Sequence, residues 1–117
     1  MNPTIAETAS WLQGIERQRR QDAQRRAQAI RARLPAAVRM LRDRHGVGRI
    51  WLFGSLATGE VHAESDLDLA VEGLADDAYF QALGDLSRLL PCAIDLIRME
   101  EAPQTLASRI LDEGEAL

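Results

Sequence analysis

The chain has 117 residues, of which 46% are hydrophobic and 27% are charged, and its formal net charge is −4. This composition is typical of one globular domain and excludes a disordered or collagen-like chain. The single cysteine, Cys92, excludes an internal disulfide and fits a reducing cytoplasm, where we expect the protein. We identify no signal peptide and no long uncharged apolar run.

The first part of the chain is basic and has a helical pattern. Residues 1–50 carry a charge of +7 with eleven arginines, whereas residues 51–117 carry −11. Residues 3–33 are rich in strong helix formers, and Thr4 with Glu7 matches a capping box. A seam of apolar residues at spacings of three and four follows: Ala23, Ala27, Ile30, Leu34, Ala37 and Leu41.

This pattern predicts an arginine-rich helical extension over residues 1–34, followed by one domain over residues 35–117. Pro35 is expected either to kink the helical seam or to start a second helix, which would end at Gly46. The extension could bind nucleotide or RNA phosphates, dock on a partner protein or pack on its own domain. Docking or self-packing fits better than nucleic-acid binding, because the arginines lack interleaved aromatic residues.

The acidic part of the chain alternates short apolar runs with helical segments, which predicts an α+β fold with a small mixed sheet flanked by helices. The predicted strands are residues 49–53, 67–71 and 93–97, and the predicted helices are residues 56–60, a segment after Asp76 or Asp77, and residues 102–113. The inner face of the middle helix is expected to contain Tyr79, Phe80, Leu83, Leu86, Leu89 and Leu90.

Two short motifs stand ten residues apart at the ends of the first two strands. Gly54 follows the first strand and permits a tight turn, and Ser55 is expected to N-cap the short helix after it. Asp66 and Asp68 occupy alternate strand positions, so they share one face of the sheet. Two neighbouring carboxylates repel each other and need a cation, and oxygen ligands suit Mg²⁺. The two motifs together favour a nucleoside triphosphate held through Mg²⁺.

The third predicted strand contains one acidic residue, Asp95, among apolar neighbours. We expect the strand to be buried, and a buried acid needs a compensating partner. The simplest hypothesis is that Asp95 joins Asp66 and Asp68 at one metal site.

The spacing Gly-Ser, ten residues, Asp-x-Asp resembles the signature of the polymerase-β-like nucleotidyltransferase superfamily. Its setting, LFGSLATGEVHAESDLDLAV, is similar to the minimal nucleotidyltransferase branch, which includes antitoxins paired with HEPN-domain toxins, and the resemblance covers about residues 36–115. Related proteins often carry Ala-Arg-Gly after the Gly-Ser pair. Here the triplet is Ala57-Thr58-Gly59, so a positive charge near the phosphates is missing from this position.

The resemblance implies a polymerase-β-like core and an enzyme that transfers AMP from ATP. It implies that Asp66, Asp68 and Asp95 hold two Mg²⁺ ions, and that Asp95 helps to deprotonate the acceptor hydroxyl. It also implies that Gly54, Ser55 and Ser65 bind the nucleotide.

The resemblance implies an acceptor tyrosine on a partner HEPN-type toxin. We expect no room in this chain for an acceptor-binding domain, which fits an acceptor carried by another protein. Two alternatives remain open: a non-catalytic antitoxin that neutralises its partner by contact, and a nucleotidyltransferase that modifies a small molecule of the antibiotic kind. Oligomers with itself or with the partner are compatible with either kind of antitoxin, and membrane association is not expected.

Overall fold

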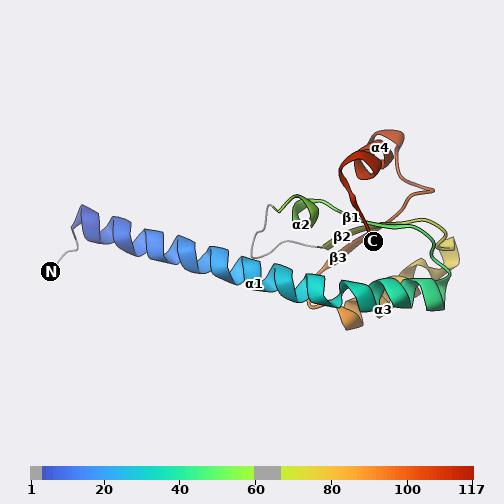
Figure 1. The fold of residues 1–117 in the computed structure, drawn as a ribbon, viewed down its shortest axis with the longest axis horizontal. Helices are drawn as coiled ribbons and strands as arrows, with labels where there is room; N and C mark the ends of the chain where they lie inside the picture. The colour runs from blue at the N-terminus through green and yellow to red at the C-terminus, as the bar shows by residue number, and fades with distance from the viewer. Residues whose placement is uncertain (1–3, 60–66) are drawn as a thin grey trace.

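A computed structural model describes residues 4–59 and 67–117 of the chain (Figure 1). The elements in chain order are α1 (Ile5–His45), β1 (Ile50–Phe53), α2 (Ser55–Thr58), β2 (Leu67–Val71), the 3-10 turn η1 (Asp76–Ala78), α3 (Tyr79–Leu89), β3 (Ile94–Arg98), α4 (Gln104–Glu113) and β4 (Glu115–Ala116). The predicted α+β class, with a small mixed sheet flanked by helices, is confirmed.

The four strands form one sheet in the order β3-β2-β1-β4. Strand β1 is antiparallel to both β2 and β4, whereas β2 and β3 are parallel. The sequence analysis did not identify β4, because its two residues are too short for a periodic pattern and form a strand only by pairing with Trp51 and Leu52. Strand β3 lies at one edge of the sheet, which becomes important at the candidate site.

The two faces of the sheet are covered by different helices (Figure 1). Alternate residues of the strands, such as Leu52 and Leu69, face the main core that they share with α1 and α3. On the other face, Trp51 and Ala70 pack against Ile110 of α4 in a smaller cluster. Polar side chains at the end of this second face are therefore on the same side of the sheet as α4.

Helix α1 begins and ends as its sequence predicts. The N–H of Glu7 donates to Thr4 Oγ1 at 3.1 Å, and the N–H of Thr4 donates to a Glu7 carboxylate oxygen at 3.0 Å. Gly46 ends the helix with a φ of 67°. Two alternatives were predicted at Pro35, a kink and the start of a second helix, and the second is wrong because α1 continues through this residue. Leu34 and Ala37 are buried in the same core on either side of Pro35, and their burial keeps the helix continuous despite the lost hydrogen bond.

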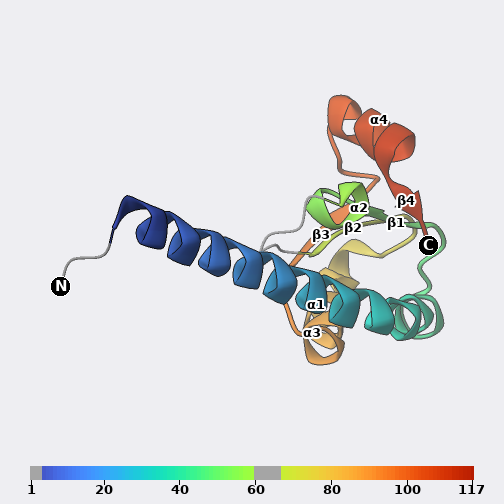
Figure 2. The same cartoon turned by 60° about the vertical axis from the view of Figure 1, so that its left-hand side comes forward.

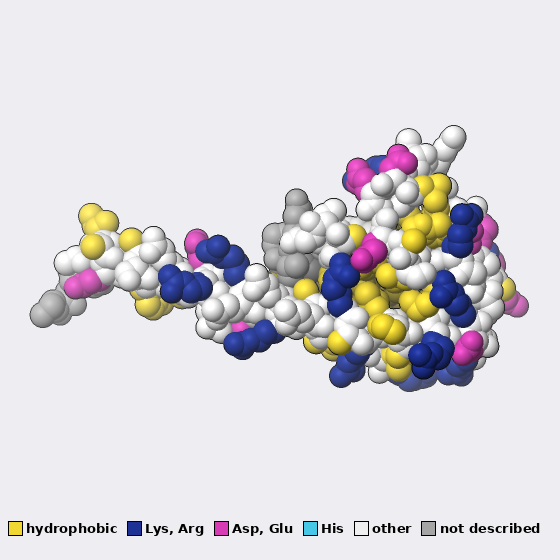
Figure 3. Space-filling model, viewed as in Figure 1, with side chains coloured by type: hydrophobic (Ala, Val, Ile, Leu, Met, Phe, Trp, Pro, Cys, Tyr) yellow, Lys and Arg dark blue, Asp and Glu magenta, His cyan; other side chains and the backbone are white. Residues whose placement is uncertain are grey.

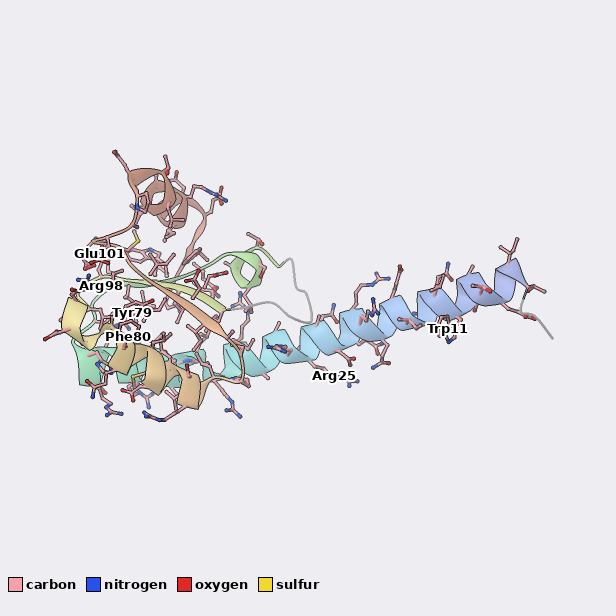
Figure 4. The ribbon with its side chains drawn as sticks, turned by 180° about the vertical axis from the view of Figure 1, so that it is seen from behind. Trp11, Arg25, Tyr79, Phe80, Arg98 and Glu101 are labelled. Carbon is pink, nitrogen blue, oxygen red and sulfur yellow. The ribbon has the colours of Figure 1, made fainter. Side chains whose placement is uncertain are left out.

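The first half of α1 projects away from the sheet (Figures 1 and 2), and the molecule is 63 Å long as a result. None of the residues 5–22 is buried, and Trp11 is 66% exposed. Figures 3 and 4 show basic and hydrophobic side chains along this projecting half, with Trp11 far from the sheet. Helix α1 therefore packs on its own domain only through the apolar seam that starts at Ala23. The division after residue 34 stays a prediction, since α1 runs across it.

Helix α3 differs from its prediction at its first turn. Phe80 was expected on the inner face but is 82% exposed, whereas Ala82 and Leu86 are fully buried. Phe80 lies outside the stripe because residues two and six positions later face the core. The N-cap residue of α3 is Ala78, so neither Asp76 nor Asp77 caps this helix with its side chain. In the described parts of the chain, no helix combines the length and the apolarity that crossing a membrane requires.

Candidate functional site

The candidate site starts at the turn between β1 and α2. Gly54 follows β1 directly with φ 73° and ψ −154°, a conformation that only glycine adopts readily. The prediction that Ser55 caps a helix over residues 56–60 is wrong: the helix begins at Ser55 itself, ends at Thr58, and has Gly54 at its N-cap position without a side-chain cap bond. The conformation of Gly54 turns the strand directly into the helix, so no separate capping residue is needed.

Gly54 lies against the side chain of Asp68 on the neighbouring strand. A Cβ atom on Gly54 would be 3.0 Å from Cγ of Asp68 and would overlap its carboxylate. Phe53 pairs with Asp68 in the antiparallel ladder between β1 and β2, which sets this approach. The Gly-Ser turn and one acid of the Asp-x-Asp motif are thus in direct contact.

Asp68 and Asp95 are register partners on the parallel strands β2 and β3. Register partners on neighbouring strands project to the same face, so both carboxylates lie on the face that α4 covers further along. The expectation that Asp95 sits in a buried strand is wrong, because β3 is an edge strand and Asp95 is exposed. Burial therefore gives no reason for an acidic residue at position 95. Its position beside Asp68 on the neighbouring strand is still what a shared metal site requires.

Two predicted site residues, Ser65 and Asp66, lie outside the described residues. The nucleotide-binding role of Ser65 and the metal-binding role of Asp66 therefore stay predictions. Within residues 4–59 and 67–117, no cluster of three or more His, Cys, Asp or Glu side chains is arranged to hold a metal ion. Asp68 and Asp95 supply carboxylate oxygens on adjacent strands, which is the ligand chemistry that Mg²⁺ prefers, so the residues present fit such an ion.

A pocket of about 340 Å³ separates the Gly-Ser turn from α4. It is lined by Phe53, Gly54, Ser55, Thr58, Leu106, Arg109, Ile110 and Glu113. This volume lies within the range of small-molecule sites. The sequence analysis did not identify Arg109 and Glu113 as site residues. Their spacing of four on an amphipathic helix places them on one side of it, beside the buried Ile110, but it does not reveal that α4 docks opposite the turn.

A second polar cluster lies on the other face of the sheet, between α1 and α3. Asp85 is only 4% exposed, and its carboxylate is 2.8 Å from His45 Nε2 and 2.7 Å from Arg88. The hydrogen bond to His45, together with Arg44 and Arg88, lowers the pKa of Asp85 below 3.8 although burial opposes this shift. The sequence analysis missed this cluster, which joins two helices and is separate from the candidate site.

The mixed sheet, the glycine turn against Asp68 and the register pairing of Asp68 with Asp95 fit the nucleotidyltransferase class that the sequence resembles. A family model described as "Polymerase beta, Nucleotidyltransferase" matches residues 37–117, and the chain belongs to this family. The family resemblance inferred from the sequence is thereby confirmed.

Two kinds of relative refine the comparison. The protein adenylyltransferase MntA of Shewanella oneidensis is 30% identical over 84 residues, which are 68% of this chain and 60% of that protein. The chain therefore spans 60% of the length of this relative. A solved structure described as a minimal nucleotidyltransferase is 32% identical, with a TM-score of 0.68 over 78% of this chain and 95% of that one.

A crystal structure of a toxin–antitoxin complex with AMP-PNP is also similar. It is 29% identical to this chain, with a TM-score of 0.61, and the match covers 68% of this chain and 67% of that chain. The identity and the fold agree in placing the chain among small nucleotidyltransferases.

Proposed function

We propose that this protein is a Mg²⁺-dependent adenylyltransferase that transfers AMP from ATP to a tyrosine hydroxyl of a partner HEPN-type toxin, and so acts as an antitoxin in the cytoplasm. The observation that supports this most is the contact of Gly54 with Asp68, which is itself the register partner of Asp95. The MntA relative, a protein adenylyltransferase, and the nucleotide-bound toxin–antitoxin structure support the choice of reaction.

In this proposal Asp68 and Asp95, with Asp66, would hold two Mg²⁺ ions. Bound Mg²⁺ supplies positive charge that offsets the charge of the reacting phosphates. Gly54 and Ser55, with Ser65, bind the triphosphate, since the missing side chain of Gly54 lets the backbone approach it closely. The tyrosine oxygen attacks the α-phosphorus, the bond to the pyrophosphate breaks, and Asp95 accepts the hydroxyl proton.

The exposure of Asp95 on an edge strand fits a protein acceptor. A hydroxyl carried by a large partner reaches such a position from solvent without entering a closed cavity. The projecting half of α1, with exposed Ile5, Trp11 and Leu12, would add a docking surface for that partner. We propose residues 1–34 as this extension and residues 35–117 as the nucleotidyltransferase domain.

The experiment is transfer of labelled AMP from ATP onto a partner co-expressed with the protein. We expect label on the partner, and loss of label with Asp68→Asn and with Asp95→Asn. Full neutralisation of the partner by both variants would instead favour a contact-only antitoxin. Label on a small molecule, with the purified protein alone, would favour the antibiotic-modifying alternative.

A further inference from the structure

If the pocket beside the Gly-Ser turn binds phosphates, their negative charge requires a positively charged group nearby. Helix α2, which runs from Ser55 to Thr58, contains no positively charged side chain. The Thr58 hydroxyl donates within its own turn, 3.3 Å from the carbonyl oxygens of Gly54 and Ser55. Because the carboxylate of Asp68 lies against Gly54, a positively charged side chain that binds a phosphate chain at this turn, in addition to Mg²⁺, has to come from another element.

Helix α4 brings such a cation to the same pocket. Arg109 lines the pocket together with Gly54, Ser55 and Thr58. Its neighbour Ile110 is 1% exposed and packs against Trp51 and Ala70, which fixes α4 on this face of the sheet. The packing of Ile110 therefore sets the position of the Arg109 backbone beside the pocket.

Arg109 is also available for a ligand. Among the residues that the structure describes, it forms no hydrogen bond and no ion pair, whereas several other arginines hold the fold together. Arg31 bonds Glu115 and the carbonyl of Leu56, and Arg98 bonds the carbonyl of Leu74. Glu113, one turn after Arg109 in the same pocket, is not paired with it.

We propose that Arg109 binds the triphosphate of the nucleotide, and that it supplies from α4 the positive charge that Thr58 does not supply from α2. This inference rests on the proposed function and assigns to it a nucleotide-binding residue outside the Gly-Ser and Asp-x-Asp motifs. A guanidinium suits this task because its planar donors match phosphate oxygens.

The test is calorimetric binding of ATP, inorganic tripolyphosphate and adenosine to the whole protein in the presence of Mg²⁺. We expect Arg109→Gln to weaken ATP and tripolyphosphate binding about tenfold and to leave adenosine binding unchanged. Arg39→Gln is the matched control, because it removes the same charge from an exposed position of α1 outside this pocket. Thr58→Arg in the Arg109→Gln background is expected to restore most of the lost affinity.

Equal ATP affinity of Arg109→Gln and Arg39→Gln would overturn this inference and leave the proposed function standing. Weaker binding of adenosine as well would overturn it too, because the effect would then not depend on the phosphates. A wild-type protein that binds neither ATP nor tripolyphosphate would contradict the proposed function itself. Equal melting temperatures of the two glutamine variants verify that folding does not cause the difference.

Discussion

Gly54 and the carboxylate of Asp68 occupy adjoining space, so that even a methyl group on residue 54 would overlap the acid. We expect Gly54→Ala to displace Asp68, to abolish AMP transfer and to destabilise the fold by about 1–3 kcal/mol from backbone strain. Activity and chemical denaturation measure the two effects. Gly59→Ala is the control, because Gly59 also has a positive φ, 82°, but its added Cβ would meet no atom within 4 Å among residues 4–59 and 67–117. Similar activity loss in both variants would show that strain alone is responsible.

Removal of Mg²⁺ should lower the melting temperature of the protein, because Asp68 and Asp95 are the proposed ligands. Because two neighbouring carboxylates repel each other, we expect Mg²⁺ to raise the melting temperature of the wild type by binding the folded state. Asp68→Asn should lose most of this rise. Asp77→Asn, on the exposed turn before α3, should retain the full response. An equal response of Asp68→Asn and the wild type would contradict a metal at this acid.

The Asp85–His45 contact predicts a pH-dependent contribution to stability. Because the pKa of Asp85 is lowered in the folded protein, its contribution is present above 3.8 and is lost as the pH falls through the lower folded value. Asp85→Asn should therefore lower the urea midpoint at neutral pH, and its difference from the wild type should shrink below about pH 4. Asp43→Asn on the exposed side of α1 should show no such convergence. A constant difference across this range would refute the assignment.

The two halves of α1 should differ in their importance for stability. Ile30 is 1% exposed in the main core, so Ile30→Ala should cost about 2–5 kcal/mol of unfolding free energy. Trp11 is 66% exposed on the projecting half, so Trp11→Ala should change stability by less than about 0.5 kcal/mol. Denaturant unfolding of both variants measures this contrast. A large loss with Trp11→Ala would mean that the projecting half packs on something in solution.

The sequence predicted those elements whose pattern is local. The strand at Leu67–Val71 was located without error because an alternating apolar run is bounded by an acidic motif and by Gly73. The capping box and the buried seam of α1 were also confirmed, since both depend on residues three or four apart. Such patterns are readable because the interacting residues are close together along the chain.

Features that depend on the docking of distant segments were missed or mistaken. The exposure of Asp95 follows from the edge position of β3, and strand order is not encoded in the strand itself. The presence of Arg109 and Gly54 in the lining of one pocket depends on how α4 packs across the sheet. The continuity of α1 at Pro35 reflects burial on both sides, which outweighs a local helix breaker.

The parallel pairing of β2 with β3 has one further consequence. A slip of β3 by a single residue would turn Asp95 toward the main core and would bring Leu96, now 3% exposed, out to the opposite side. The hydroxyl of Tyr79 donates to the carbonyl of Leu96 at 2.6 Å and opposes such a slip. The packing of Leu96 in the main core thus maintains the register that aligns Asp95 with Asp68 on the opposite face of the sheet. A substitution at Leu96 is therefore expected to lower activity although its side chain lies on the other face.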